Sequence, residues 1–482
     1  MSKGFFSNLS LLFILNILVK PIWLFGVERS VQNTLGEATY GLYFAMFNLT
    51  LVFNIFLELG INSFNNRSIA QQPTKINSYL PNLLFLKAIA SIGFATLIFL
   101  VGLALGYKNQ QLLLLGLCSL NLMVVSLILF LRTNISGLQY FKIDGIFSVL
   151  DRSLMIVFVG LLLWLPPTKN SFNVFWFVGA QIVANFVVAL TAFFFVLSKV
   201  KFPTFKIDFS IAKVLLTKAL PFALLSFLMA IYYRIDGIML ERLLKIDGAE
   251  QSGIYAAAYR LLDAANMAGY LFATILLPLF SKLLADKVEI GSLLKFSANL
   301  LIVLVLSLSI PVYVFASPIM NLLYINSTPY YGYVLKILIL TSIPIALVYV
   351  YGTLLVANNN LKILNYLALV GVLFNITLNC LLIYKLKAVG AGYTTLLTQW
   401  LVALIQIYFC HKFLNLEFKN IEFLKLITFA FLGYIIANLL YITFNGSLWT
   451  FILSGVLLVS LSLFMKIISV KEIKKWTKLR AA

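Results

Sequence analysis

Charged residues, cysteine and histidine are all scarce in this sequence of 482 residues. Only 11% of the residues are charged, whereas soluble domains average about 25%. Hydrophobic residues make up 62% of the chain, and no polar stretch is long enough to form a separate soluble domain. The composition therefore excludes an ordinary soluble protein and predicts an all-α polytopic membrane protein.

The shortage of cysteine and histidine limits metal chemistry. Cys118, Cys380 and Cys410 all fall in apolar runs, where cysteine usually packs as a small hydrophobic side chain. The single histidine, His411, lies at a predicted helix end. One histidine and three scattered cysteines cannot form a usual zinc site, so we expect no metal and no cofactor.

Acidic residues are also few, at 16 against 36 Lys and Arg, which gives a net charge of +20. In a soluble protein this excess would suggest nucleic-acid binding. In an apolar chain, membrane orientation is the first explanation to test.

Apolar runs of roughly 18 residues or more predict membrane spans. The first run, 9–27, lacks a small-residue cleavage site and is interpreted as a retained helix, not a signal peptide. We expect about fourteen spans, at 9–27, 39–60, 80–106, 111–131, 147–166, 172–198, 217–241, 253–280, 294–316, 333–357, 363–384, 388–411, 424–444 and 447–469.

The distribution of Lys and Arg supports this arrangement. If the N-terminus is cytoplasmic, most of these residues fall in cytoplasmic gaps and in the two tails. The gaps on the other side hold only Arg29, Lys108, Lys169, Arg242, Lys245, Lys385 and Lys387. This bias follows the positive-inside rule and predicts that both termini are cytoplasmic.

A short motif recurs after the first span of each half. "LGEATYGLYFAMFNL" begins at Leu35 and "DGAEQSGIYAAAYRL" begins at Asp247, so that an offset of 212 aligns Gly36 with Gly248 and Gly41 with Gly253. Parallel repeats are a recurring transporter plan, with the substrate site between them. We expect a six-helix lobe over 1–198, a cytoplasmic linker over 199–218, a second six-helix lobe over 219–412, and an appended helix pair with a basic tail over 413–482.

Apart from charged residues at the span ends, six Lys and Arg lie inside the predicted spans, and four acidic residues accompany them. They are Lys20, Glu58, Lys87, Asp151, Arg152, Arg234, Asp236, Arg260, Asp263 and Lys336. A charge at membrane depth costs several kcal/mol, so such residues usually serve a function. The spacing places Lys20, Arg234, Asp236, Arg260, Asp263 and Lys336 in the outer halves of their spans, and Asp236 could pair with Arg260.

Two interpretations compete for these cations. Lys87, Arg152 and Lys336 lie within about two turns of a predicted span end, which favours side chains that extend to the lipid headgroups. Lys20, Arg234 and Arg260 instead favour a cationic cavity, where arginine would provide paired donors to a phosphate or pyrophosphate. Uncharged amides inside the predicted spans, such as Asn121 and Gln181, could line a hydrated path for sugars or simply join helices.

The sequence offers little support for an enzyme. The predicted outer loops are short and hold no carboxylate cluster, and no glycine loop with its lysine is present to hold a nucleotide phosphate. Transport would therefore be driven by an ion gradient or by the substrate gradient.

The segments "LGEATYGLY…LELGINSFNNRSIA" and "ALPFALLSFLMAIYYRIDGIMLERLL…SGIYAAAYRLLD" resemble the polysaccharide-transporter family. Its members are flippases for lipid-linked oligosaccharides in the MATE-like exporter superfamily. The resemblance covers most of the chain and implies two six-helix lobes around a V-shaped central cavity that alternates between inward-open and outward-open states. The last two helices would guide the lipid tail.

The resemblance also implies a substrate and a set of roles. An undecaprenyl-pyrophosphate-linked O-antigen, capsule or similar repeat unit would leave the cytoplasmic leaflet of the bacterial inner membrane. By position, Lys20, Arg234 and Arg260 match the family's cationic cavity, and Arg67 matches its basic residue at the inner end of the second helix. For ion coupling or charge pairing, Asp236 is the first candidate and Asp263 and Glu58 come next.

Partners and alternatives follow from the same comparison. The implied partners are membrane lipids, a proton or sodium counter-ion, and the polymerase and glycosyltransferases of the same pathway. An ion-coupled multidrug exporter of the same superfamily is the nearest alternative, although cationic drugs favour an acidic cavity. A membrane glycosyltransferase or polymerase is a further alternative, but such enzymes usually present a large outer loop.

Overall fold

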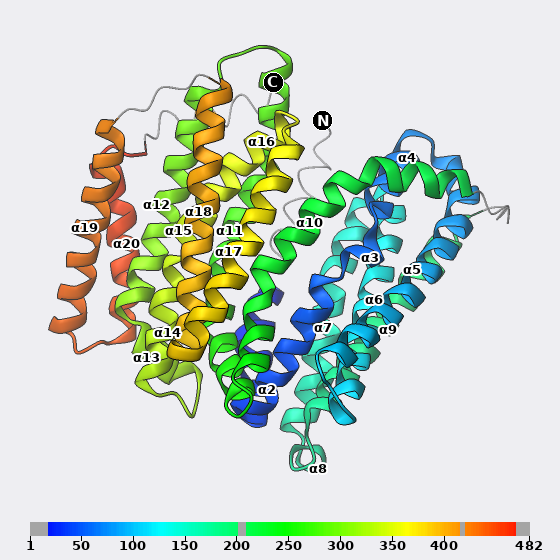
Figure 1. Ribbon diagram of the computed structural model, residues 1–482, viewed down its shortest axis with the longest axis horizontal. Helices are drawn as coiled ribbons and strands as arrows, with labels where there is room; N and C mark the ends of the chain where they lie inside the picture. Colours follow the sequence, from blue (N-terminus) through cyan, green and yellow to red (C-terminus); the bar gives the residue numbers. More distant parts are fainter. Residues whose placement is uncertain (1–17, 201–208, 415–419, 469–482) are drawn as a thin grey trace. The chain divides into compact units, whose positions relative to one another are not determined.

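The computed structural model describes residues 18–200, 209–414 and 420–468, and these residues form helices and short connections with no strand (Figure 1). By internal contacts the chain divides into two units, Met1–Gly253 and Ile254–Ala482. Each unit is built from helices that carry many apolar residues on more than one face, which is typical of helices surrounded by protein and lipid.

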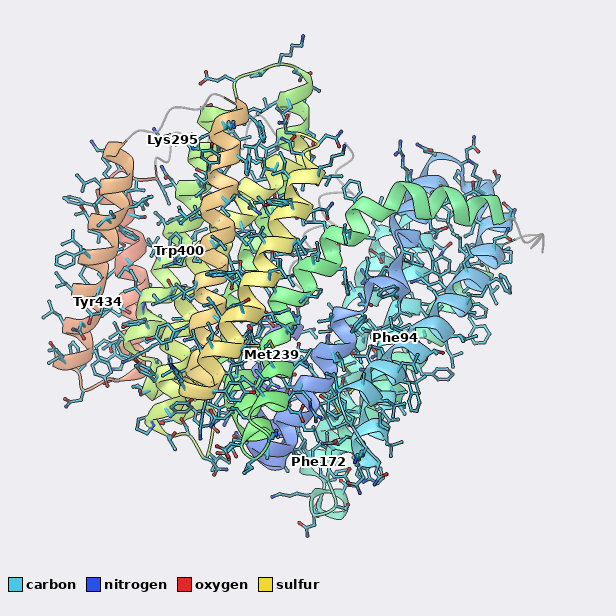
Figure 2. The ribbon with its side chains drawn as sticks, viewed as in Figure 1. Phe94, Phe172, Met239, Lys295, Trp400 and Tyr434 are labelled. Carbon is cyan, nitrogen blue, oxygen red and sulfur yellow. The ribbon has the colours of Figure 1, made fainter. Side chains whose placement is uncertain are left out.

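The first unit centres on the long helix α6 (Gln110–Gly137), which packs against α2, α5 and α9. Phe94 of α5 is fully buried in this unit (Figure 2). Besides α6, the elements of this unit are η1 (Ile22–Glu28), α2 (Arg29–Val52), α3 (Ile55–Glu58), α4 (Ile61–Gln71), η2 (Pro73–Lys75), α5 (Ile76–Ala104), α7 (Phe141–Trp164), α8 (Pro166–Lys169), α9 (Val174–Leu197) and α10 (Phe209–Leu243).

The second unit centres on α12 (Gly291–Val314), which contacts α14, α15, α19 and α20. The helices α19 (Asn420–Thr443) and α20 (Leu448–Phe464) form a pair at one edge of this unit (Figure 1). The other elements are α11 (Gly248–Ala285), α13 (Ala316–Leu323), α14 (Pro329–Leu340), α15 (Ser342–Leu347), η3 (Val348–Gly352), α16 (Thr353–Ala357), α17 (Leu361–Leu386) and α18 (Ala388–Leu414).

The helices confirm an all-α polytopic membrane protein but not the number fourteen. Among the described residues, eleven helices are long and apolar enough to span a membrane, and a bent pair, Leu18–Val52 with Ile55–Gln71, could make a twelfth. The apolar helix α20 is shorter than these. Most of the first predicted span lies outside the described residues.

The first helix extends further than its hydropathy predicts. The span predicted to end at Val27 continues as helix to Leu35, and Gly36 then departs from helical geometry at a kink, where φ is 77° and ψ is 168°. Hydropathy treats the polar segment 28–37 as a loop, but Gln32 in this segment is buried and its Nε2 donates to Gly253 O at 3.0 Å. A polar side chain with a buried partner can belong to a helix interior.

The recurring motifs meet each other in the first unit. A Cβ atom on Gly41 would lie 1.8 Å from Ala249 O, and one on Gly253 would lie 2.1 Å from Glu37 O. Gly41 and Gly253 are related by the offset of 212, and so are Glu37 and Ala249. The contact is therefore reciprocal, as expected when two copies of one motif cross around a local two-fold axis.

The contact-based boundary differs from the predicted linker. Because α10 packs along α2, it groups with the first unit, and the boundary falls inside α11. The helix α10 begins at Phe209, within the predicted linker 199–218, part of which lies outside the described residues. The predicted division into two six-helix lobes stays a prediction.

Candidate functional site in a broken helix

The chain that begins as α2 breaks in the middle of a predicted span. The helix α2 ends at Val52, the short helix α3 ends at Glu58, and α4 begins at Ile61 after a bend of 45°. Leu59 and Gly60 have φ values of 39° and 74°, and left-handed backbone is costly for leucine. At membrane depth, irregular backbone is tolerated where it is buried in protein or lines a cavity.

A cavity of about 350 Å³ lies between this break and α10. Its volume is at the lower end of the range for small-molecule sites, about 300–1,000 Å³. The cavity is lined by Leu51, Val52, Asn54, Ile55, Glu58, Gly60, Asn62 and Ser63 from the broken helix, and by Phe222, Ala223, Ser226 and Ala230 from α10.

Three aromatic rings join the two walls beside the cavity. Phe227 of α10 lies 5.8 Å from Phe53 and 6.0 Å from Phe56, measured between ring centroids. Aromatic pairs at such distances stabilise a contact beyond the area that they bury. The rings therefore hold α3 at a fixed spacing from α10.

A buried ion pair stabilises the backbone at the helix break. Lys87 of α5 is 4% exposed, and its Nζ lies 3.7 Å from Glu58 Oε1. The same ammonium donates to Leu57 O at 2.8 Å and to Ser126 Oγ at 2.6 Å. Ser126 in turn donates to Glu58 Oε1 at 3.1 Å, and Asn62 Nδ2 donates to Glu58 Oε2.

This network corrects the interpretation of Lys87 as a side chain that extends to the headgroups. Leu57 O lies in the last turn of α3, where carbonyl groups lack an intrahelical donor. The ammonium of Lys87 supplies that donor and also neutralises Glu58. Sequence analysis missed this role because the two charges come from different helices.

Because α10 runs antiparallel to the broken helix, Arg234 and Arg67 lie one helical turn beyond opposite ends of the cavity. Arg234 is half-buried and follows the lining residue Ala230 by four residues on α10. Arg67 is exposed and follows the lining residue Ser63 by four residues on α4. Residues four apart share one helix face, so the fold associates two of the four predicted substrate-binding cations with one cavity.

Lys20 belongs to a helix that is longer than the predicted span. Because its helix continues to Leu35, Lys20 is about 22 Å along the helix axis from that end, at 1.5 Å per residue. Arg152 and Asp151 of α7 are among the charges that act on Lys20. The position of Lys20 in the outer half of its span stays a prediction.

The other two intramembrane cations that were predicted to reach the headgroups lie over aromatic rings. The Arg152 guanidinium is 5.5 Å from the ring centroid of Trp23 and forms an ion pair with Asp151 at 3.8 Å. Lys336 Nζ is 5.7 Å from the ring centroid of Tyr313. Cation–π contacts of this kind stabilise a charge without requiring a headgroup.

The remaining predicted site residues are strongly buried or belong to the second unit. Asp236 of α10 is 1% exposed, and Arg260 of α11 is 6% exposed. Asp263 is three residues after Arg260 on α11, on the same side of the helix. The predicted Asp236–Arg260 pair joins residues of different units and stays a prediction. Within the described ranges, no group of three His, Cys, Asp or Glu side chains could hold a metal ion.

A second cluster, also missed from sequence, fixes the end of α10. Tyr107, between α5 and α6, donates its hydroxyl to Glu241 Oε2 at 2.9 Å. Arg242 pairs with Glu241, donates to Leu105 O at 2.8 Å, and places its guanidinium 3.8 Å from the Tyr107 ring centroid. Burial raises the pKa of the Tyr107 hydroxyl, and the Glu241 carboxylate raises it further.

Comparison with known proteins identifies the family. The sequence model of polysaccharide biosynthesis proteins matches residues 6–284, which is more than half of the chain. The chain belongs to the polysaccharide biosynthesis protein family. This confirms the family resemblance and, with the apolar helices, makes the chain a multi-pass membrane protein. Comparison with curated protein sequences gives no significant match.

Solved structures of other proteins have the same fold as this chain. The lipid II flippase MurJ, in an inward closed conformation, is similar with a TM-score of 0.72 and 15% identity, over 95% of this chain and 99% of that chain. A multidrug resistance MATE transporter of the MOP superfamily, inward-facing, gives a TM-score of 0.63 and 14% identity, over 85% of this chain and 97% of that chain. A MOP superfamily transporter from Pyrococcus furiosus is described with a binding pocket of reverse polarity. It gives a TM-score of 0.56 and 13% identity, over 85% of this chain and 93% of that chain.

Proposed function

We propose that this protein is a flippase that moves lipid-pyrophosphate-linked oligosaccharides across a bacterial inner membrane. The substrate is an undecaprenyl-pyrophosphate-linked repeat unit of O-antigen, capsule or a similar polysaccharide. It enters from the cytoplasmic leaflet and leaves in the outer leaflet by alternating access, with both termini of the protein in the cytoplasm. Membership of the polysaccharide biosynthesis family supports the substrate class, and likeness to the MurJ fold supports the type of movement.

The observation that carries the proposal is the cavity at the broken helix with a cation on each side. Arg234 and Arg67 each follow a lining residue by one helical turn. Guanidinium groups bind phosphate oxygens through paired hydrogen bonds. In this proposal they hold the pyrophosphate, together with Lys20 and Arg260 from other parts of the chain, in a central V-shaped cavity between two six-helix lobes.

Acidic residues in the spans provide for coupling. Asp236 is the first candidate to bind a proton or sodium ion or to orient the arginine two residues before it, and Asp263 comes next. Glu58 is the third candidate, and its pairing with Lys87 favours a structural role. The polymerase and glycosyltransferases of the pathway are the expected protein partners.

The competing function is ion-coupled multidrug export, and a protein of similar fold is described as a multidrug resistance MATE family transporter. Buried Asp236 is the observation that favours it, because an ionisable residue inside a membrane span is a candidate for ion coupling. The two arginines beside the cavity favour an anionic substrate instead. A membrane glycosyltransferase or polymerase has less support, since the described connections between helices are short.

Deletion of the gene in its own host tests the function. The measurement is the amount of lipid-pyrophosphate-linked oligosaccharide on each membrane face. We expect it to accumulate on the cytoplasmic face, with loss of the surface polysaccharide. Normal polysaccharide with increased sensitivity to cationic drugs would contradict the proposal and support drug export.

Single substitutions test the cations. We expect Arg234→Gln and Arg67→Gln each to reduce restored surface polysaccharide about tenfold or more, because each removes charge-assisted hydrogen bonds to the pyrophosphate. Lys20→Gln and Arg260→Gln are compared in the same assay, and Lys142→Gln, at an exposed position of α7, is the matched control. Full activity of all four variants at normal protein levels would contradict the cationic site.

A further inference from the structure

The side chains that line the cavity at the broken helix are mostly uncharged, unlike the two arginines beside it. Among the described residues that line the cavity, Glu58 alone carries a charge. That charge is matched by Lys87, which lies behind the wall and directs its donors to Leu57 O and Ser126 Oγ. A pyrophosphate placed in the cavity would therefore lose water and face a carboxylate without gaining a cation.

The polar groups of the wall suit an uncharged ligand rich in hydroxyl groups. Asn54, Asn62, Ser63 and Ser226 bring amides and hydroxyls to the lining. Asn62 Oδ1 is buried and has no hydrogen-bond partner among the residues that the structure describes. A carboxylate has about four acceptor positions, so Glu58 can accept from a ligand as well as from Asn62 and Ser126.

An arginine lies one helical turn beyond each end of the cavity. Arg234 follows Ala230 and Arg67 follows Ser63, each by one turn. A molecule with its uncharged part in the cavity would reach a guanidinium at the edge of the lining. This arrangement matches a sugar joined to a pyrophosphate, with a different subsite for each part.

We propose that the cavity bounded by Asn54, Glu58, Asn62 and Ser226 is a saccharide subsite, which binds the sugar next to the pyrophosphate through neutral hydrogen bonds. The inference rests on the proposed function, because it assigns one part of the proposed substrate to one part of the site. It also assigns the Glu58–Lys87 pair a definite role, namely to present an acceptor to sugar hydroxyls while remaining neutral overall.

The test compares two probes that differ only in the sugar. Purified full-length protein in lipid nanodiscs is titrated with bare undecaprenyl pyrophosphate and with undecaprenyl pyrophosphate that carries a neutral disaccharide. We expect the wild-type protein to bind the sugar-bearing probe about tenfold more tightly, which corresponds to one or two net hydrogen bonds.

The variants Asn54→Leu and Ser226→Leu each remove polar groups from the cavity without changing charge. We expect both to lose the preference for the sugar-bearing probe while the bare probe binds as before. Thr96→Leu, at an exposed position on α5, is the matched control and should retain the preference. Neither variant removes a charge from the Glu58–Lys87 pair, so the support for the break remains.

Two results would overturn the inference while leaving the proposed function intact. One is equal weakening of both probes by Asn54→Leu and Ser226→Leu, which would place the pyrophosphate in the cavity. The other is an unchanged preference for sugar in both variants at normal folding. If the wild-type protein binds neither probe, the proposed function fails, and the saccharide subsite fails with it.

Discussion

At the scale of single residues, the intramembrane charges serve different purposes. Lys87 is a structural charge, because it is buried, paired with Glu58 and bonded to a backbone carbonyl. Arg234 is only half-buried and lies next to a cavity. A buried charge with a full set of partners is stable in place, whereas a charged residue beside a cavity is a candidate for a role in substrate binding.

Lys87→Met should lower the stability of the protein by about 3 kcal/mol, since it leaves Glu58 without its counter-charge and Leu57 O without a donor. Thermal unfolding of the purified protein measures the effect. Lys142→Met, at an exposed position, should be neutral. The double variant Lys87→Met/Glu58→Gln should recover much of the loss, and a single variant as stable as the control would contradict the structural role.

Tyr107→Phe should cost about 1–2 kcal/mol, because the hydroxyl donates to buried Glu241. The raised pKa of Tyr107 keeps the hydroxyl protonated in the folded protein, while an unfolded tyrosine ionises near pH 10. The stability difference from wild type should therefore be constant from about pH 6 to 9 and be lost as the pH rises above 10.

Thermal unfolding across this pH range checks the prediction, with Tyr366→Phe as control at an exposed position of α17. A Tyr107→Phe variant as stable as that control, or a stability difference that already declines between pH 6 and 8, would show that the hydroxyl is not a buried donor to Glu241.

At the scale of elements, hydropathy predicted the helices well and their interruptions poorly. Most predicted spans coincide with helices because an apolar run in lipid must satisfy its backbone internally. The break after Val52 was missed because its residues are mainly apolar. The signals that could have revealed it are Asn54, Glu58 and Gly60, a polar group, a charge and a glycine within two turns.

The Glu58–Lys87 pair could not be predicted for a different reason. Residues on separate helices become neighbours only through tertiary packing, and no local spacing encodes that distance. Arg234 and Arg67 were identified as candidates because charge in or beside a span is visible in the sequence. Their relation to one cavity depends on α10 packing along the broken helix.

Gly41→Ala should prevent normal packing of α2 against the start of α11, since the new Cβ would lie 1.8 Å from Ala249 O. We expect a marked loss of folded protein, measured as the monodisperse fraction after purification. Gly93→Ala is the matched control, because Gly93 lies within α5 and a Cβ there would meet nothing within 4 Å. Equal yields of the two variants would contradict the close crossing.

At the scale of the whole molecule, the family and the helical fold were predicted correctly, while the division into two lobes stays a prediction. Contacts assign α10 to the first unit, whereas the predicted linker would place most of this helix in the second lobe. Composition predicts a membrane protein because long apolar runs with few charges are stable in lipid and not in water.

The predicted orientation can be tested with single cysteines in a variant that lacks Cys118, Cys380 and Cys410. Ser171→Cys and Ser198→Cys lie at exposed positions at opposite ends of α9. With cytoplasmic termini, a membrane-impermeant maleimide should label Ser171→Cys in intact cells and Ser198→Cys only after permeabilisation. The opposite pattern would reverse the orientation.

The most direct test of the central claim is flipping by the purified protein in liposomes. Undecaprenyl-pyrophosphate-linked oligosaccharide is placed in both leaflets, and its exposure to an added sugar-modifying enzyme is followed over time. We predict that wild-type protein brings the protected half of the substrate to the outer face, while Arg234→Gln does so about tenfold more slowly or not at all. The account would be contradicted if folded wild-type protein left the inner half of the substrate as inaccessible to the enzyme as it is in protein-free liposomes. This result would have to hold under a proton gradient and also under a sodium gradient.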